Sequence, residues 1–439
     1  MKKYSERSIG LCDCNNFFVS CERREDPSLV SRPVVVLSGN DGCIVSRSEE
    51  VKAAGVAMGE PYFKARGVLE HIGAAVLSGR LGLYNKISSE VMACLSRFTD
   101  TMEVYSIDEA FINLAIASVE DAEAYCRAIR AEIWRSCGIP VSLGISSTKT
   151  LAKLASHVAK KSRAGVFWLD AAHRDDAAWM GAFPAGEVWG VGRKTAAKLA
   201  LRGRVNTAAE LMRADDLWLK ENFSINTLYT AWELRGFQAY PLAASHGAAK
   251  SVQVSRSFGE PVYSFDELLD AVSYFTICAA RQLRGMKQRA SRMGLYLRTS
   301  PFRRENFYSR FEECSFRVPR SLDADFLAAA RLLLSRVFEA GRPYKKAGVL
   351  LSDFADVSCG VQGLLFDGGE SGSPAAHRAA ETADALNAEF GRVVIAPADN
   401  FAAPKSPARW HPRREHSAAA DEARGRPAMQ LGPKRRVNF

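Results

Sequence analysis

Two adjacent carboxylates, Asp108 and Glu109, stand between two short apolar runs, 102–106 and 110–114, which are predicted to be β-strands. Neighbouring side chains on an extended strand point in opposite directions, so a tight turn between strands is needed to bring both carboxylates to one point. Burying unpaired negative charge in an apolar setting is costly, and a divalent cation is the simplest group that offsets it. The segment therefore predicts a metal-binding hairpin, with a solvated acidic turn as the alternative.

A third acid lies far upstream, at the end of another apolar run. Asp13 ends a predicted strand at 8–14 and precedes a predicted helix at 16–24. An acid at the carboxyl end of a strand lies where sheets commonly bind ligands. Because Mg²⁺ takes oxygen ligands, usually carboxylates and substrate phosphates, Asp13, Asp108 and Glu109 could together hold two such ions. The alternative for Asp13 is an N-cap of the helix that follows.

The order of the predicted elements indicates a multidomain α+β fold. Strand 8–14 and helix 16–24 are followed, after a long insertion, by the acidic hairpin, a helix at 119–137 and a strand at 140–146. This β-α-β-β-α-β order is that of a ferredoxin-like sheet, and it places the three acids on neighbouring strands.

The insertion, 25–79, carries small elements of its own. A Gly-Asn-Asp-Gly turn at 39–42 joins two β-rich runs and predicts a hairpin. A short helix at 47–55 follows and ends at a glycine. Its Arg47 and Lys52 could contact phosphates, or they could belong to a solvated helix face.

Two basic helical segments come after the first sheet. The helix 147–161 carries several lysines, which suit phosphate binding as point charges. Further on, Gly190 and Gly192 precede Arg193 and Lys194 in a pattern similar to a helix-hairpin-helix element. Glycines there let backbone N–H groups approach a DNA phosphate without reading base sequence. For both segments the alternative is a solvated basic face.

A second β-α-β-β-α-β unit is predicted between 251 and 354, and it contains no acidic cluster. Its strands carry Arg256, Arg292, Arg298 and Arg317. Arginines on sheet strands could follow a phosphate backbone, so the unit is predicted to bind nucleic acid; an ordinary polar outer face is the alternative.

Composition limits the partners and the compartment. The chain has 59 Lys plus Arg against 49 Asp plus Glu, a formal net charge of +10, which suits a polyanion such as nucleic acid. No apolar segment is long enough to span a membrane, and no signal sequence is expected at the start. The ten cysteines form no paired metal knuckles and several lie in apolar runs. We therefore expect a reduced protein of the cytoplasm, with no membrane partner.

Several ordered motifs carry a family resemblance over about residues 8–400. They are Cys12–Phe18, Asn40–Cys43, Tyr105–Phe111, Thr148–Lys153, Val188–Gly192, Ser255–Gly259 and Tyr344–Val349. The chain resembles the Y-family translesion DNA polymerases, and within them the UmuC branch of bacterial DNA polymerase V. The resemblance implies a right-hand polymerase whose parts can be assigned by residue number. They are a ferredoxin-like palm (1–24 and 80–170), small inserted fingers (25–79), a helix-hairpin-helix thumb (171–240), a β-α-β-β-α-β little finger (243–355) and a mobile C-terminal tail (356–439).

The resemblance also implies roles for the acids and their neighbours. Asp13, Asp108 and Glu109 match the catalytic metal-binding acids, and the Cys14 carbonyl is an additional ligand for the two Mg²⁺ ions. Phe18 matches the steric gate that excludes ribonucleotides.

The implied triphosphate contacts come from four further positions. They are Phe17, through its backbone, and the side chains of Arg47, Lys52 and Lys160. Glu49 stands where many relatives carry a phosphate-binding tyrosine, and Arg47 could compensate for this difference.

The implied partners are primer–template DNA, dNTPs, a sliding clamp, a processed UmuD dimer and a RecA filament. Gln362, Leu365 and Phe366 match the clamp-binding peptide of the family, although Gly363 replaces a usual leucine. The segment 431–436 is only distantly similar to the family's C-terminal motif, so the UmuD and RecA contacts made there stay open.

The combined prediction is an error-prone, template-directed DNA polymerase that copies damaged templates in the SOS response. Two alternatives remain at this point. A nucleotidyl cyclase can share a palm-like sheet with paired acids, and a noncatalytic scaffold could be tethered to the clamp. The basic segments argue against the cyclase, and retention of all three acids argues against the scaffold.

Overall fold

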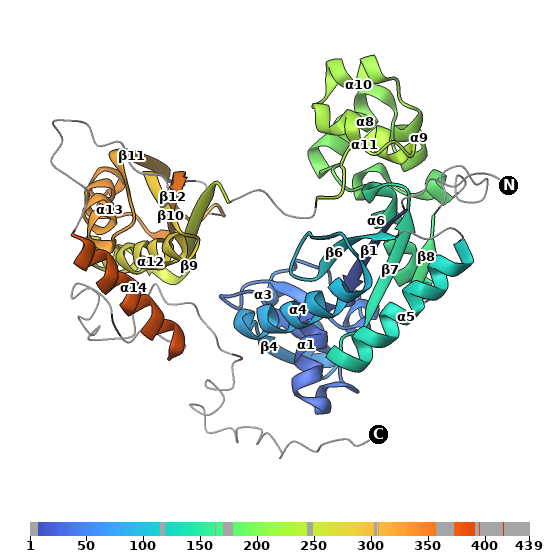
Figure 1. Cartoon of the computed structure of the whole chain (residues 1–439), viewed down its shortest axis with the longest axis horizontal. Helices are drawn as coiled ribbons and strands as arrows, with labels where there is room; N and C mark the ends of the chain where they lie inside the picture. The colour runs from blue at the N-terminus through green and yellow to red at the C-terminus, as the bar shows by residue number, and fades with distance from the viewer. Residues whose placement is uncertain are drawn as a thin grey trace. The chain divides into compact units, whose positions relative to one another are not determined.

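In the computed structural model, the chain divides into two compact units, each described by itself (Figure 1). The first unit comprises the described residues up to Ser38 and from Cys43 to 243, and the second comprises Gly39–Gly42 and those from 249 onward. The structure describes residues 8–114, 119–162, 164–169, 179–243, 249–302, 305, 307–356, 373–390, 395 and 416.

A five-stranded sheet forms the centre of the first unit, in the order β5-β6-β1-β7-β8. Its strands are β1 (Ser8–Cys14), β5 (Met102–Val104), β6 (Glu109–Leu114), β7 (Val141–Ser146) and β8 (Val166–Trp168). β1 is antiparallel to both β6 and β7, whereas the added edge strand β8 is parallel to β7. The observed order of β5, β6, β1 and β7 thus confirms the predicted ferredoxin-like order, and β8 adds one strand to it.

The alternation of side chains along β1 decides what lies on each face of this sheet. Cys12 and Cys14 belong to the large core formed with the helices of one face, whereas Ile9 and Leu11 pack with Ala152 on the other. The first face is covered by α1 (Phe17–Glu25), α4 (Leu81–Leu95) and α5 (Val119–Cys137), and the second by α6 (Lys149–Lys161). Because side chains alternate with a period of two, Asp13 shares the α6 face with Leu11.

A glycine on β7 allows α6 to lie unusually close to the sheet. A Cβ atom at Gly144 would lie 2.1 Å from the backbone nitrogen of Ser156 and 2.4 Å from the Ala152 carbonyl oxygen. Backbone atoms of a packed helix cannot move away cheaply, so only glycine fits at this position. The lysines of α6 are thereby brought close to the strands that carry the acids.

The insertion after α1 forms a small three-stranded sheet in the order β3-β2-β4. Its strands are β2 (Val34–Leu37), β3 (Ile44–Arg47) and β4 (Ala75–Ser78), and its helices are α2 (Glu49–Ala53) and α3 (Tyr62–His71). The predicted hairpin is confirmed by the antiparallel pairing of β2 with β3. A separate apolar cluster that includes Leu37, Ile44 and Leu69 fills the space between sheet and helices.

Short helices form a cluster beside α6 (Figure 1). They are α8 (Arg193–Gly203), α9 (Ala208–Arg213), α10 (Asp216–Asn222) and α11 (Ile225–Leu234). Thr207 closes the start of α9 with a capping box, because its hydroxyl accepts from the Glu210 N–H while the Glu210 carboxylate accepts from the Thr207 N–H. The cluster shares one apolar core with Leu151 and Leu154 of α6.

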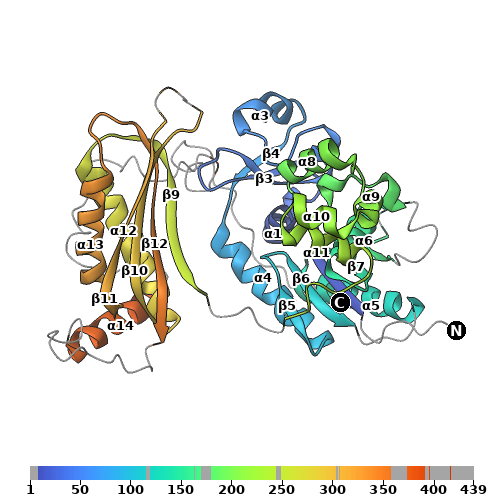
Figure 2. The same ribbon diagram turned by 90° about the horizontal axis from the view of Figure 1, so that it is seen from above.

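The second unit is an antiparallel sheet in the order β11-β10-β12-β9, with two helices on one face (Figure 2). The strands are β9 (Ser251–Val262), β10 (Gln288–Thr299), β11 (Ser309–Arg320) and β12 (Tyr344–Asp356), and the helices are α12 (Phe265–Gly285) and α13 (Asp323–Val337). The predicted β-α-β-β-α-β order is confirmed. The strand order differs from that of the first sheet, because β12 lies between β9 and β10 rather than at an edge.

One helix falls within the stretch that we expected to be a mobile tail. Residues Pro374–Glu389 form α14, whose Asp384 accepts hydrogen bonds from the buried Arg284 of α12 at 2.7 and 3.0 Å. Ser373 caps its first turn. The expectation of a mobile tail is therefore wrong for this helix. The only buried residue of this helix is Asn387, so no buried apolar stripe predicts it from sequence.

No helix among the residues that the structure describes is long and apolar enough to cross a membrane.

Candidate metal and nucleotide site

The three predicted acids lie together at one end of the five-stranded sheet. Asp13 on β1 is the direct cross-strand partner of Glu109 on β6. The backbone N–H of Cys14 donates to the Asp108 carbonyl oxygen at 2.9 Å, which fixes the acidic turn against the end of β1. The register therefore brings together residues that are almost a hundred positions apart, as the predicted strand order implied.

Ser106 organises the acidic turn, a role that the sequence patterns did not reveal. Its hydroxyl donates to Asp108 Oδ1 at 2.6 Å and accepts from the backbone N–H groups of Asp108 and Glu109 at 3.2 and 3.0 Å. A serine bonded in this way mimics a backbone turn. The separation of Ser106 and Asp108 by two residues is the signal that could have identified it.

Each acid on the sheet is paired with a lysine of α6. Lys160 Nζ lies 2.5 Å from Asp13 Oδ2, and Lys153 Nζ lies 2.8 Å from Glu109 Oε2. The two lysines are seven positions apart, so they share one helix face. Lys160 was predicted as a phosphate ligand, whereas Lys153 was not assigned any role. Its spacing from Lys160 could have indicated that both face the sheet.

Burial raises the pKa of Asp13 from its ordinary value to about 7. The nearby Glu109 carboxylate raises it further, whereas the Lys160 ammonium opposes the shift. The two carboxylates, Asp13 and Glu109, are therefore poorly tolerated in their doubly ionised form unless additional positive charge is present. Such a carboxylate pair is a natural site for a divalent cation.

The donor chemistry of the site fits a hard divalent cation. Every side-chain ligand expected there is a carboxylate oxygen, and Cys14 directly follows Asp13 in the chain. The Cys14 sulfur lies in the core on the other face of the sheet, and burial raises the pKa of its thiol, so the sulfur is not a ligand. Among the described residues, no group of three or more His, Cys, Asp or Glu side chains converges closely enough to hold a metal ion, so the three acids would have to draw together around a bound cation. The two lysines show instead where positive charge is favoured.

The predicted gate residue is held in place by an aromatic stack. The rings of Phe18 and Tyr84 lie 4.5 Å apart at an interplanar angle of 15°. The Tyr84 hydroxyl donates to Glu22 Oε1 at 2.6 Å, and Arg80 also binds the Glu22 carboxylate. Phe17 itself is buried in the core of the sheet, so only its backbone can contact a ligand.

The two predicted phosphate ligands on the insertion do not join the acids. Arg47 turns into the insertion and donates to the Val56 carbonyl. Lys52 Nζ lies 2.6 Å from Glu49 Oε1. The same Glu49 oxygen accepts from Asn16 Nδ2 at 2.9 Å.

An aromatic group around Lys153 adds residues that the sequence analysis did not assign. The Lys153 ammonium lies 4.4 Å from the centre of the Tyr105 ring and 5.8 Å from that of Trp189. Trp189 Nε1 donates to the Tyr105 hydroxyl at 3.0 Å. These cation–π contacts fix the ammonium that pairs with Glu109.

The predicted DNA-binding glycines precede α8. Gly190 has a positive φ of 88°, and a Cβ atom there would lie 2.7 Å from Thr230 Oγ1. Gly192 caps α8, and nothing lies within 4 Å of its Cβ position. The exposed Arg193 and Lys194 occupy the first turn of α8. This start of a helix is therefore open to an anion.

The arginines of the second unit divide between two locations. Arg292 and Arg298 alternate with the buried Met293, Leu295 and Leu297 along β10, so they lie on the helix-free face of the sheet. Lys346 on β12 is the cross-strand partner of Arg298.

Arg256 belongs to a different part of the second unit. It is the cross-strand partner of the buried Ala347 and alternates in step with the buried Val254 and Phe258, so it lies on the helix-covered side, at the edge strand β9. The structure thus separates the predicted Arg256 from the other basic residues.

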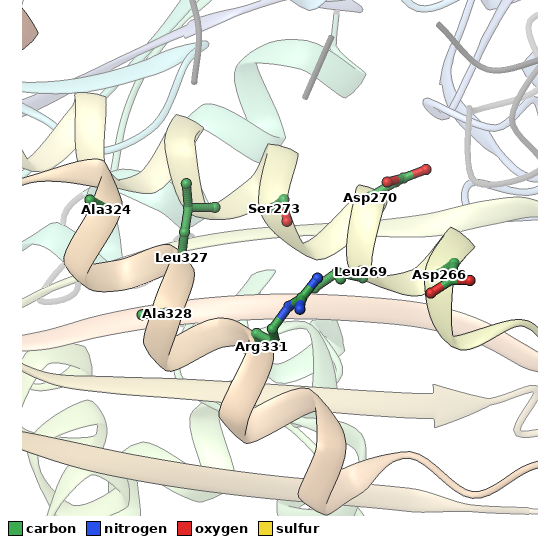
Figure 3. A pocket seen from close by; sticks show the side chains of 8 residues that line it. All are labelled: Asp266, Leu269, Asp270, Ser273, Ala324, Leu327, Ala328 and Arg331. Atoms are coloured by element: carbon green, nitrogen blue, oxygen red, sulfur yellow. The ribbon is translucent and has the colours of Figure 1, made fainter. Parts of the chain in front are cut away.

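The predicted clamp peptide, with Gln362, Leu365 and Phe366, falls outside the described residues. A cavity of about 710 Å³ lies between α12 and α13, with Asp266 and Asp270 on one side and Arg331 on the other (Figure 3). It belongs to the second unit, whereas the acids belong to the first.

Two family models match the chain. The model described as the impB/mucB/samB family matches residues 12–157, and the model of the C-terminal domain of that family matches residues 249–364. The three acids fall in the first match, and the helix-free face of the second sheet falls in the second.

Curated relatives and solved structures agree with these matches. Protein UmuC from Salmonella typhimurium is 36% identical over 93% of this chain and 96% of its own length. DNA polymerase IV from Corynebacterium diphtheriae is 28% identical over 82% of this chain and 78% of its own length. A solved Y-family DNA polymerase chimera, Dbh-Dpo4(243-245)-Dbh, has 19% sequence identity and a TM-score of 0.64, covering 80% of this chain and 99% of that chain.

Proposed function

This chain belongs to the impB/mucB/samB family, and we propose that it is a DNA-directed DNA polymerase of the Y family that copies damaged templates by nucleotidyl transfer. The observation that carries the proposal is the cross-strand pair of Asp13 and Glu109, with Asp108 fixed beside it. Relatives named as DNA polymerases share most of the chain. The error-prone, SOS-linked role follows from the likeness to UmuC. Neither the cyclase nor the scaffold alternative has comparable support.

We assign the metal-binding role to Asp13, Asp108, Glu109 and the Cys14 carbonyl. Two Mg²⁺ ions bound there would activate the primer hydroxyl and stabilise the leaving pyrophosphate. The protein's own contribution is to hold the carboxylates in register. Ser106 orients Asp108, and Lys153 orients Glu109 until the substrate is bound.

The nucleotide is held, in this proposal, by the Phe17 backbone and by phosphate contacts of Lys52 and Lys160. Phe18 lies beneath the sugar, where its ring would clash with a 2′-hydroxyl. Arg47 joins the phosphate contacts only if it leaves the Val56 carbonyl.

DNA is proposed to contact Gly190, Gly192, Arg193 and Lys194 at the start of α8. On the second unit, the helix-free face supplies Arg292, Arg298 and Lys346, and we give Arg256 a peripheral role because of its place at the edge strand. These residues bind the phosphate backbone and therefore do not select sequence.

The further partners are a sliding clamp, a processed UmuD dimer and a RecA filament. Clamp binding is assigned to Gln362, Leu365 and Phe366, and deletion of 362–366 should weaken clamp affinity. Unchanged affinity would mean that this peptide is structural. We place the protein in the cytoplasm, because the nine described cysteines are free thiols, as in a reducing compartment.

Primer extension across an abasic site, with Mg²⁺ and dNTPs, tests the proposed activity. The assay is run with and without UmuD and RecA, since activity can depend on partner subunits. Extension past the lesion by the parent protein, and none by Asp108→Ala, is the expected result. No nucleotide addition under any of these conditions, on damaged or undamaged templates, would refute the proposal.

A further inference from the structure

Glu49, at the start of α2, joins two elements through a single carboxylate oxygen. Its Oε1 accepts from Asn16 Nδ2 at 2.9 Å and from Lys52 Nζ at 2.6 Å. Asn16 has a left-handed backbone, with φ of 47°, in the turn between Asp13 and Phe18. Glu49 therefore connects the insertion with the turn that lies between the proposed metal-binding Asp13 and the proposed steric gate Phe18.

Both lysines assigned to the triphosphate are held by carboxylates in this structure. Lys160 pairs with Asp13, and Lys52 pairs with Glu49. The consequences of releasing them differ. Asp13 is an expected ligand of a divalent cation, which would replace the lost ammonium. Glu49 is not one of those ligands, so release of Lys52 breaks the Lys52–Glu49 ion pair without a metal ion to replace the ammonium.

We propose that Glu49 is a positioning residue that lowers nucleotide affinity by competing with the triphosphate for Lys52. This inference rests on the proposed function, because it requires that Lys52 contacts the nucleotide. The carboxylate acts in two ways: it holds the ammonium, and its charge repels the phosphates. The side chains are 70% exposed for Glu49 and 34% exposed for Lys52, so the effect is modest and sensitive to salt.

The test is a double-mutant cycle with Glu49→Gln and Lys52→Ala. Glutamine keeps an oxygen for Asn16 but removes the charge. Binding of a non-hydrolysable dNTP analogue with Mg²⁺ is measured by equilibrium titration, and KM and kcat by primer extension. We expect Glu49→Gln to lower Kd and KM about three- to fivefold, a small change because an exposed ion pair contributes little. The value of kcat should stay unchanged, because the ion pair acts equally on the ground state and the transition state.

The cycle and two controls separate competition from a structural effect. In the Lys52→Ala background, Glu49→Gln should give less than half of its gain. Raising NaCl to about 0.5 M should reduce the gain as well. Glu50→Gln removes a charge from the neighbouring position, where the carboxylate pairs with Arg23, and should leave Kd and KM unchanged.

Three results would overturn the inference. They are no gain for Glu49→Gln, an equal gain without Lys52, and an equal gain for Glu50→Gln. If the parent protein binds the analogue and extends primers, these results reject only the role of Glu49. If the parent neither binds the analogue nor extends primers, the proposed function fails together with the inference.

Discussion

Asp13 and Glu109 face each other across β1 and β6, and each carboxylate is paired with a lysine of the same helix, α6. The arrangement holds negative charge at one point by using ammonium groups on the same face of the sheet. In the proposed function, divalent cations would compete for the two carboxylates, and the triphosphate would compete for Lys160.

Removal of Asp108 should abolish nucleotidyl transfer while the protein still binds DNA. Asp108→Ala deletes a carboxylate that we propose binds metal, but it leaves the basic residues at the start of α8 and on the second sheet intact. We expect extension to fall on the order of a thousandfold, as when a charge-stabilising group is lost from an active site. Single-nucleotide incorporation and DNA binding by fluorescence anisotropy are measured together. Extension equal to that of the parent would show that the metal assignment is wrong.

The stability of the metal-free protein should depend on pH through Asp13. Burial raises the folded-state pKa to about 7, above the ordinary value of 3.8, so the folded state binds more protons than the unfolded state between these values. The free energy of unfolding therefore falls as pH rises from about 4 to 7. Asp13→Asn should remove this decline. By the time the pH is above 7, the free energy of unfolding of the variant should have fallen by about 2–4 kcal/mol less than that of the parent.

Urea unfolding in EDTA at several pH values measures the effect. Glu221→Gln changes an exposed acid on α10 and should follow the parent at every pH. Parallel pH curves for Asp13→Asn and the parent would contradict the assigned cause.

The acids could be predicted from sequence because strand order and alternation determine where they lie. Strands β1, β5, β6 and β7 were each recognisable, so their shared end followed from topology. The partners of the acids were harder to predict. Lys153 reaches Glu109 because α6 approaches the sheet closely at Gly144, and strand order does not predict that approach. Ser106 acts through local hydrogen bonds within the acidic turn, which strand order does not predict either.

The less accurate predictions concern residues whose location depends on competing contacts. Arg47 has a suitable charge for phosphate binding, but a nearby backbone carbonyl engages it. Arg256 was assigned because it is one of several arginines on the strands of the second unit, yet it is the cross-strand partner of the buried Ala347 and lies on the helix-covered side. Helix α14 makes an ion pair with Arg284 through Asp384, a contact that no periodic pattern of the sequence predicts.

Substitution of Phe18 should weaken discrimination against ribonucleotides. The ring is held by stacking on Tyr84, so it occupies a fixed position rather than moving away from a 2′-hydroxyl. Phe18→Ala should lower the ratio of kcat/KM for dNTP over rNTP by roughly 10- to 200-fold, the range that steric discrimination provides. Tyr84→Leu should lower it less, because the gate remains but is less fixed. An unchanged ratio for Phe18→Ala would exclude the gate assignment.

A methyl group at Gly144 should destabilise the first unit. Its Cβ would meet the backbone of α6, and we expect Gly144→Ala to cost about 3 kcal/mol or more in urea unfolding. Gly10→Ala on β1 is the matched control, because its Cβ would meet side-chain atoms of Leu114 and Ile112 at 2.9 and 3.0 Å, and these can move. A smaller loss at Gly144 than at Gly10 would contradict the argument from close packing.

The helix-free face of the second sheet should bind DNA more strongly than Arg256 does. Arg298 and Lys346 are cross-strand partners on that face, whereas Arg256 lies towards α12. Arg298→Ala and Lys346→Ala should each weaken binding and reduce the slope of log K against log salt by about 1, because each removes one phosphate contact. Arg256→Ala should change the slope by less than either. A larger effect of Arg256→Ala would instead place the DNA at the edge strand β9, because the slope counts the phosphates that the protein neutralises.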